Sequence, residues 1–189
     1  MQEARFTCPV ADADHYIDGA INGDADCFGK LYDHYVERVY RHVYYRTGDV
    51  KDTEDLTQQV FIKAWKAIGR YKKTSSPFLA WLMKISHNLV IDYYRQKKYQ
   101  STLEYDTFFD SEDKSPENSA ENHFEQQQLR KAILKLPSDQ QQVVIMSFIE
   151  GFTYSEIASV LNKSEGNIRV ILHRSLRKMR EILKAESLG

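Results

Sequence analysis

Basic residues gather near the C-terminal end of the chain, at a spacing that suits contact with a polyanion. Six Lys or Arg residues and one acid lie between residues 169 and 184. The pattern there is a short capped helix, a tight turn and a longer basic helix, the anatomy of a helix-turn-helix motif. The second helix of such a motif enters the major groove, where Arg recognises guanine through two parallel hydrogen bonds. This segment therefore predicts contact with DNA.

We expect the start of the basic helix to face base edges and its later part to face phosphates. The side chains expected nearest the bases are Asn167, Arg169, Val170, His173 and Arg174. Arg177 and Lys178 lie farther along, where phosphate contacts are expected. The hydroxyls of Thr153 and Ser155, at the start of the preceding helix, suit another phosphate. A helical hairpin with a solvated basic face is the alternative, and this motif alone does not decide between the two.

A second group with nucleic-acid chemistry occupies residues 69–76, which read GRYKKTSS. An aromatic ring that stacks on one base contributes about 1–3 kcal/mol, which is comparable with the few kcal/mol needed to unstack that base. Capture of an unpaired base is therefore physically credible. The ring, the charges and the first hydroxyl come from Tyr71, Arg70, Lys72, Lys73 and Thr74. A plain solvated loop is the alternative.

The helix expected after this loop places polar side chains at steps of three and four residues. These are Trp81, Lys84, Asn88, Asp92 and Arg95. We expect Asn88 to contact a base, and Lys84 and Arg95 to contact phosphates. Trp81 is favoured as a core residue, since tryptophan is usually mostly buried. Asp92 would repel phosphate and is expected to orient a neighbouring cation.

The elements that must position these groups are all predicted to be helices. Apolar residues recur at three- and four-residue steps, as in the stripe from Phe28 to Val43, and no segment alternates as a strand would. Asp52 is a candidate N-cap, Ser76-Pro77 a helix start, and Thr153 to Glu156 a capping box. The sequence thus predicts an all-α fold of two small helical domains joined by a flexible acidic linker. Their expected ranges are residues 12–99, 100–122 (the linker) and 123–186.

Composition excludes several classes of protein. The chain has 189 residues, of which 42% are hydrophobic and 28% charged, which argues against a disordered or fibrous protein. No apolar run approaches the roughly 20 residues of a membrane span, so no membrane contact of its own is expected. Two cysteines, Cys8 and Cys27, fit a reduced cytoplasm. The six histidines show no ligand spacing, and we expect no metal, no cofactor and no catalytic residues.

Net charge is −1, but the charge alternates along the chain. Residues 63–99 hold nine basic residues and one acid, and residues 129–189 hold ten basic and six acidic residues. The other two segments, 1–62 and 100–128, are acidic. Two separate basic segments favour a protein that binds one polyanion at two places. A single charged run, however, is usually just a solvent-exposed face.

Two blocks of the sequence resemble parts of a bacterial RNA polymerase sigma factor of the compact extracytoplasmic-function group. Asp55 to Lys98, preceded by Ala20 to Tyr45, resembles region 2. Leu136-Pro137, EGFTYSEIA (150–158) and SEGNIRVILHRSLRKMREIL (164–183) resemble region 4. The blocks occur in the family's order, and together they are far more specific than either alone.

This resemblance implies a function in transcription initiation that needs no catalytic residues. The first domain would bind the clamp of core RNA polymerase and open the −10 element, and the second would bind the flap and recognise the −35 element of promoter DNA. The residues that match the family's clamp-binding helix are Asp55, Leu56, Gln58, Gln59 and Phe61. The family often has Glu where Gln59 stands, so a neutral hydrogen bond would replace an ion pair. An anti-sigma factor is the further partner that the resemblance implies.

Other hypotheses remain beside this one. A stand-alone helix-turn-helix regulator explains the C-terminal half but leaves residues 55–98 unexplained. An enzyme is discounted, because no phosphate-binding glycine loop or nucleophile–base pair is present. A module that only sequesters another protein does not explain DNA-facing residues in both halves. Val170 and Ile171 stand where the family commonly has basic and small polar residues, which leaves the −35 sequence undetermined.

Overall fold

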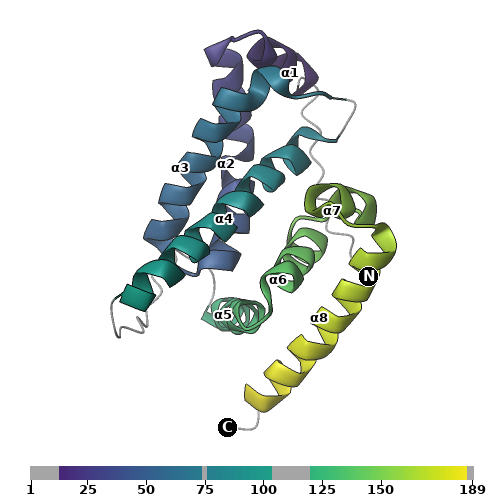
Figure 1. The fold of residues 1–189 in the computed structure, drawn as a ribbon. Coiled ribbons are helices and arrows are strands. Elements are labelled where there is room, and N and C mark those ends of the chain that lie inside the picture. Colours follow the sequence, from purple (N-terminus) through teal and green to yellow (C-terminus); the bar gives the residue numbers. More distant parts are fainter. Residues whose placement is uncertain (1–12, 74–75, 104–119, 187–189) are drawn as a thin grey trace.

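The computed structural model describes residues 13–73, 76–103 and 120–186, and no strand occurs among them. The predicted all-α fold is therefore confirmed (Figure 1). Most of the predicted acidic linker and Thr74 lie outside the described residues. The helices are α1 (Ala13–Ile21), α2 (Ala25–Thr47), α3 (Val50–Ala67), η1 (Ile68–Arg70), α4 (Phe78–Leu103), α5 (Ala120–Leu134), α6 (Ser138–Val144), η2 (Ile145–Ile149), α7 (Tyr154–Leu161) and α8 (Glu165–Glu186).

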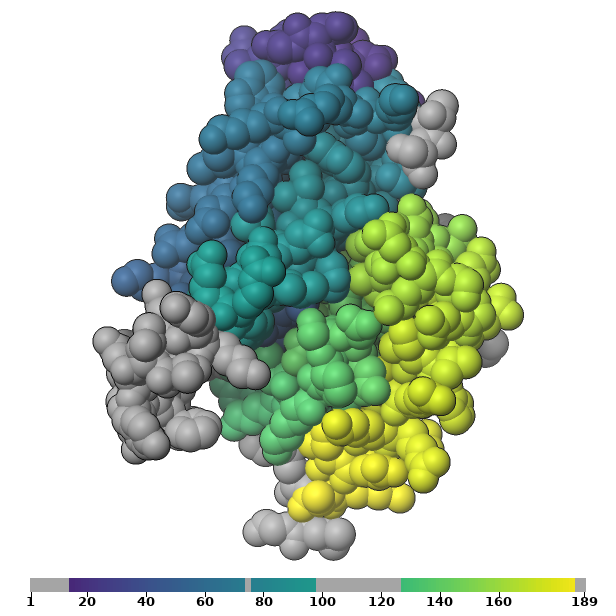
Figure 2. Space-filling model, in the orientation of Figure 1, coloured from purple at the N-terminus to yellow at the C-terminus, as the bar shows by residue number. Residues whose placement is uncertain are grey.

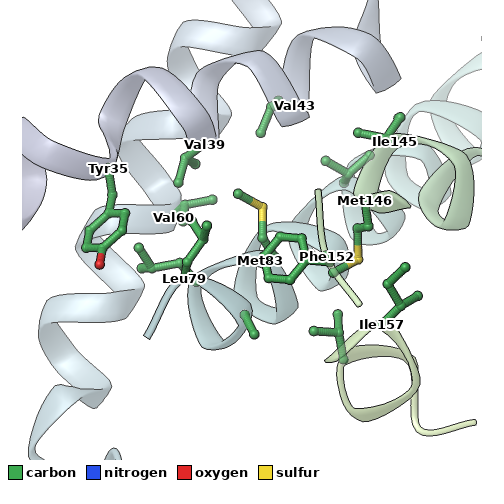
Figure 3. Close-up of a cluster of buried hydrophobic side chains, with 14 of the residues drawn as sticks. Tyr35, Val39, Val43, Val60, Leu79, Met83, Ile145, Met146, Phe152 and Ile157 are labelled. Atoms are coloured by element: carbon green, nitrogen blue, oxygen red, sulfur yellow. The ribbon is translucent and has the colours of Figure 1, made fainter. Parts of the chain in front are cut away.

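Helices α1 to α4 form the first domain, in which α2, α3 and α4 pack as a bundle and α1 lies at one end (Figure 1). The predicted stripe of α2 provides Leu31, Tyr35, Val39 and Val43 to its core, where Val39 lies next to Val60 of α3 (Figure 3). These positions recur at four-residue steps, so one face of α2 is buried while the opposite face is free for other contacts.

The ends of these helices follow local signals, with one correction. Asp49, not Asp52, is the N-cap of α3: its carboxylate accepts the Asp52 backbone N–H at 2.8 Å. Gly48 ends α2 with a φ of 73°, so the first residue after it is the one with an extended backbone suited to capping. Helix α4 begins at Phe78, directly after Pro77, as predicted.

Helices α5 to α8 form the second domain. Thr153 and Glu156 make the predicted capping box at the start of α7. Asn162, with a φ of 52°, ends α7, and the Ser164 hydroxyl accepts the Asn167 N–H at the start of α8. Gly151, with a φ of 70°, lies between η2 and α7 as the predicted helix break. A tight turn between α7 and α8 completes the helix-turn-helix anatomy.

The two domains pack against each other, which the sequence did not predict. Helix α2 contacts α5 and η2, and α4 contacts α7. Buried apolar residues of both domains form one cluster, in which Met83 of α4 joins Met146, Phe152 and Ile157 (Figure 3). The space-filling view shows the surfaces of the two domains in contact (Figure 2). Helices α4 and α5 also extend to Leu103 and from Ala120, into both ends of the predicted linker range.

Candidate nucleic-acid interface

Helix α8 presents the predicted DNA-facing residues on one open side. Its Ile168, Leu172, Ser175 and Met179 are buried, at steps of three and four residues, against α5 and α6. Figure 1 shows α8 at the edge of the molecule, on the side away from the first domain. The predicted readers and phosphate contacts are all exposed: Asn167, Arg169, Val170, His173, Arg174, Arg177 and Lys178. The side chains predicted to contact DNA therefore share one exposed face of α8.

Neighbouring groups restrain some of these side chains. The Arg169 guanidinium lies 5.5 Å from the ring centroid of Tyr154, a cation–π contact from α7. Arg177 and Glu181 form an exposed ion pair at 3.3 Å. Val170 is exposed, whereas Ile171 packs against the core. Of the two apolar departures from the family pattern, Val170 is therefore the one in a position to touch a thymine methyl group.

The first turn of α7 is partly occupied by its own cap. The Thr153 hydroxyl accepts the Glu156 N–H and donates to the Glu156 carboxylate at 2.8 Å. The Thr153 N–H also donates to this carboxylate at 2.8 Å. Ser155 is exposed. A phosphate at this turn would therefore meet the Ser155 hydroxyl first, and the Thr153 hydroxyl only if the cap opens.

Tyr71 differs from the sequence-based expectation. It was expected to offer a stacking face, but it is buried, with 8% of its surface exposed. Its ring packs against Phe78 and Trp81, with centroids 5.5 and 5.1 Å away, and its hydroxyl donates to the Ser76 carbonyl at 2.7 Å. Burial raises the pKa of this phenol to about 12. The loop is short, so the ring folds back onto the start of α4.

The cations of the same loop are exposed. Arg70 and Lys72 face solvent, and Lys73 forms an ion pair with Asp18 of α1 at 2.7 Å. Because Asp18 itself is largely exposed, solvent screens this pair, and a phosphate competes with it at little cost. The predicted positive charge of the loop is therefore present on the surface, without the exposed ring.

The polar face of α4 is divided between solvent and the second domain. Asn88 is exposed, and Arg95 is exposed beside Asp92, which pairs with it at 3.0 Å as expected. Trp81 is half-buried against the core, as favoured from sequence. Lys84 instead donates to the Asn162 side chain at 3.2 Å, in the turn of the helix-turn-helix motif. One expected phosphate contact therefore belongs to the interface between the domains.

The predicted protein-binding face of α3 has different anchors from those expected. Asp55, Gln58 and Gln59 are exposed, but Leu56 and Phe61 are buried in the core. The exposed apolar residues on the same side are Ile62 and Trp65, with exposed fractions of 53% and 38%. They follow Gln58 at steps of four and three, a signal that helical periodicity already carried. The face is an apolar pair rimmed by amides and a carboxylate, a composition typical of interfaces.

A buried polar cluster joins the two domains at Arg46 of α2. Its guanidinium donates to Gln142 Oε1 and Ser138 Oγ, both at 2.8 Å, and to His87 Nδ1 at 3.1 Å. Gln142 Nε2 then lies 3.1 Å from His42 Nε2. The Arg46 guanidinium and the Gln142 amide nitrogen can only donate hydrogen bonds. His87 Nδ1 and His42 Nε2 therefore accept them, so each of the two imidazole rings is neutral.

Electrostatics agree with this assignment. Burial, followed by the nearby Arg46 charge, lowers the pKa of His42 to about 3 and that of His87 to about 4. Burial also lowers the pKa of Arg46 to about 10, so the guanidinium stays charged at neutral pH. Gln142, Ser138 and His87, which accept its hydrogen bonds, are neutral, and the nearby Asp139 carboxylate also favours the charged guanidinium. Sequence inspection missed the cluster because its members are far apart in the chain.

Within the described part of the chain, no group of three or more His, Cys, Asp or Glu side chains is arranged to hold a metal ion. In the same residues, no helix has the length and apolar character needed to cross a membrane.

Comparisons with known proteins agree with both halves of the chain. The family described as Sigma-70 region 2 matches residues 31–99, and the family described as Sigma-70, region 4 matches residues 126–179. The ECF RNA polymerase sigma factor BldN of Streptomyces coelicolor is 34% identical over 93% of this chain and 69% of its own length. The ECF RNA polymerase sigma factor SigX of Bacillus subtilis is 30% identical over 85% of this chain and 87% of its own length.

A solved structure supports the fold. The sigma factor RpoE in complex with the anti-sigma factor NepR, from Bartonella quintana, aligns with a TM-score of 0.73. It is 22% identical and covers 83% of this chain and 96% of that chain. At this identity the likeness concerns the fold, and the alignment reaches across both helical domains.

Proposed function

This chain belongs to the ECF family of RNA polymerase sigma factors, and we propose on that basis how its two domains share the work of initiation. Sigma factors of this family direct RNA polymerase to promoters and are not enzymes in themselves, so a stand-alone regulator is no longer a competing hypothesis. We infer that the first domain binds the polymerase clamp and the opened −10 element. The second domain binds the flap and the −35 element.

The observation that carries this proposal is the open face of α8. Seven predicted DNA-contacting side chains are exposed together on it, while its opposite face is buried. Readers of base edges occupy the N-terminal half and phosphate contacts lie farther along, the order in which a recognition helix meets the major groove. The family match over residues 126–179 supports the same assignment for this helix.

On the first domain, we assign the polymerase contact to the exposed face of α3. Ile62 and Trp65 are the apolar anchors, and Asp55, Gln58 and Gln59 form the polar rim. Leu56 and Phe61 act from the core by holding this face in place. The opened −10 strand is assigned to the exposed residues of the loop and α4: Arg70, Lys72, Lys73, Asn88 and Arg95.

We further propose an anti-sigma factor as a regulatory partner and the cytoplasm as the working compartment. A sigma factor in complex with an anti-sigma factor shares this fold, which supports the first proposal. The second follows from the proposed partner, core RNA polymerase.

The direct test is run-off transcription with purified core polymerase and a library of genomic promoters. We expect specific transcripts only when this protein is added, and the shared upstream sequences define both promoter elements. The chain alone is not expected to shift promoter duplex in a gel. Failure to join core polymerase in the absence of any inhibitor contradicts the proposal.

A pair of variants in the first domain tests the polymerase contact. Ile62→Asp places a charge in the apolar centre of the proposed interface and should weaken core binding at least tenfold, measured by fluorescence anisotropy. Lys30→Asp introduces the same carboxylate at an exposed site of α2, outside the proposed face, and it should leave core binding within about twofold. Equal effects of the two variants would place the contact elsewhere.

A further inference from the structure

Tyr154 and Arg169 meet where the two helices of the helix-turn-helix motif adjoin. Tyr154 is the first residue of α7, and Arg169 lies in the second turn of α8. The central carbon of the Arg169 guanidinium lies over the Tyr154 ring, 5.5 Å from its centroid. At this distance the negative face of an aromatic ring attracts a cation. A side chain outside the recognition helix therefore restrains one of the predicted base readers.

Both residues are carried by elements with a fixed geometry. Thr153 caps α7 directly before Tyr154, and its hydroxyl and backbone N–H both donate to the Glu156 carboxylate at 2.8 Å. Asn162, with a φ of 52°, makes the turn between the helices, and Ser164 caps α8. Helices α7 and α8 contact each other and bury apolar side chains between them. The fold therefore sets the place of the ring relative to the start of α8.

The ring restrains Arg169 without using its hydrogen-bond donors. A guanidinium over an aromatic face keeps its N–H groups at its edge, where they can form the two parallel bonds that recognise guanine. Arg177, two turns later on α8, shows the opposite arrangement, since its Nε donates to the Glu181 carboxylate at 3.3 Å. Arg169 is thus held by a contact that is compatible with base recognition, whereas Arg177 is held by one that occupies a donor.

We propose that Tyr154 is a positioning residue for −35 recognition, whose ring holds Arg169 in the orientation in which the guanidinium bonds to one guanine of the element. This inference rests on the proposed function and deepens it, because it assigns sequence discrimination to a residue of the first helix of the motif. The physical reason is entropic. A long Arg side chain loses rotamer freedom when it docks on a base, and a side chain that is already held in place loses less.

The expected size of the effect follows from the exposure of the pair. Arg169 is exposed, and 37% of the Tyr154 surface is exposed, so water weakens their attraction. Exposed cation–π contacts correspond to a change of about two- to fivefold in an equilibrium. Loss of the bidentate base contact itself is larger, at least about fivefold. Removal of the ring should therefore reproduce part of the effect of removing Arg169, at the same base pair.

The experiment is a discrimination profile of the −35 element with the reconstituted holoenzyme. Competing promoters carry each of the four bases at every −35 position, and relative transcript yields give the preference at each position. Arg169→Ala should lower the preference at one G·C position by at least about fivefold. Tyr154→Leu, which keeps an apolar side chain but removes the ring, should lower it at the same position by about two- to fivefold. In the Arg169→Ala background, Tyr154→Leu should have no further effect at that position.

Tyr154→Phe is the matched variant, because it keeps the ring and removes only the hydroxyl. It should reproduce the parent profile, as should Ser159→Ala, at an exposed site of α7. If the Tyr154 hydroxyl instead bound a phosphate, Tyr154→Phe and Tyr154→Leu would weaken all promoters alike, since a phosphate contact carries no sequence information. That outcome overturns the proposal, and so does a Tyr154→Leu profile equal to that of the parent.

A measurement on the free chain tests the contact itself. The ring current of Tyr154 shifts the nuclear magnetic resonance signals of the Arg169 side chain, and Tyr154→Phe should keep this shift. Tyr154→Leu should abolish it, and a shift that Tyr154→Leu does not alter overturns the contact. If the proposed function fails, even the parent holoenzyme makes no promoter-specific transcript, which overturns both ideas. If only the positioning role fails, the parent discriminates among −35 sequences and Tyr154→Leu does so equally well.

Discussion

The two proposed DNA-binding regions of this protein differ in how far their predicted contact residues are exposed in the free chain. On α8 the candidate readers are exposed and rest on a buried stripe of the same helix. In the loop and on α4 the aromatic ring is packed into the core, and Lys84 is bonded to the other domain. The predicted contacts of the first region are thus all exposed in the free chain, whereas two of those predicted for the second, Tyr71 and Lys84, are engaged within the protein.

This difference is consistent with the DNA that each region is proposed to bind. A recognition helix meets duplex DNA, whose groove exists before the protein arrives. A site for an opened strand meets bases that must first leave the stack, at a cost of a few kcal/mol. If the binding site for the unpaired strand forms only when the promoter opens, its aromatic ring stays covered in the free protein. Four experiments can break or sharpen this contrast.

Removal of Arg46 should have the largest effect. Arg46→Ala leaves a cavity and removes the donors that satisfy Gln142, Ser138 and His87. We expect a loss of about 3–5 kcal/mol in the free energy of unfolding, measured by urea denaturation. Lys30→Ala, at an exposed site of α2, should change stability by less than about 0.5 kcal/mol. A small effect of Arg46→Ala would mean that the cluster does not hold the domains.

Tyr71→Ala should have the second-largest effect on stability, because the Tyr71 ring packs in the core. We expect a loss of about 3 kcal/mol in the free energy of unfolding, whereas Tyr71→Phe removes only the hydrogen bond to Ser76 and should cost about 1 kcal/mol. Thermal or urea unfolding measures both. If the alanine variant keeps full stability yet opens promoters slowly, the ring works as a stacking face after all.

Acid should open the contact between the domains. His42 and His87 are neutral acceptors there with lowered pKa values. Arg46 of α2 acts on both, and Asp139 of α6 and Lys163 of the turn act on His87. An imidazole that becomes hydrated regains a pKa near 6.5, so the closed state binds fewer protons and loses stability as the pH falls below about 6.5.

For fully buried His42 this loss is about 1.4 kcal/mol per pH unit, or about 2 kcal/mol at pH 5. Pulsed electron paramagnetic resonance between spin labels at the exposed residues Glu54 of α3 and Ser159 of α7 measures it at pH 7 and pH 5. The His42→Gln, His87→Gln double variant should respond much less to acid than the parent. Identical responses would show that other groups carry the pH dependence.

Arg174→Ala should have the smallest effect on folding and a clear effect on DNA. The side chain is exposed, so we expect less than about 0.5 kcal/mol on stability. Loss of a bidentate base contact should cost about 1–3 kcal/mol in −35 recognition, measured as promoter competition in transcription by the reconstituted polymerase. Lys131→Ala, at an exposed site of α5, is the control and should leave promoter choice unchanged.

Local patterns sufficed for most of the helices and for the site on α8. The capping box at Thr153, the break at Gly151 and the spacing of Ile168, Leu172 and Met179 involve neighbours within four residues, so periodicity and cap chemistry reveal them. At Phe61 and Ile62 the prediction was wrong although the local signal was present. The family resemblance pointed to Phe61, whereas the spacing of Ile62 and Trp65 from Gln58 indicated the exposed side.

What the sequence determined by itself is the helical architecture, the order of the two domains and the family, because these depend on short-range periodicity and motif order. Tertiary structure alone decided that Tyr71 is buried and that the domains are joined through Glu150 and Arg46. The bonds that join them span about 100 residues of chain, such as the 96 between Arg46 and Gln142. The sequence around a charged or amide side chain does not indicate which distant residue it will bond to, and only the fold brings the two together.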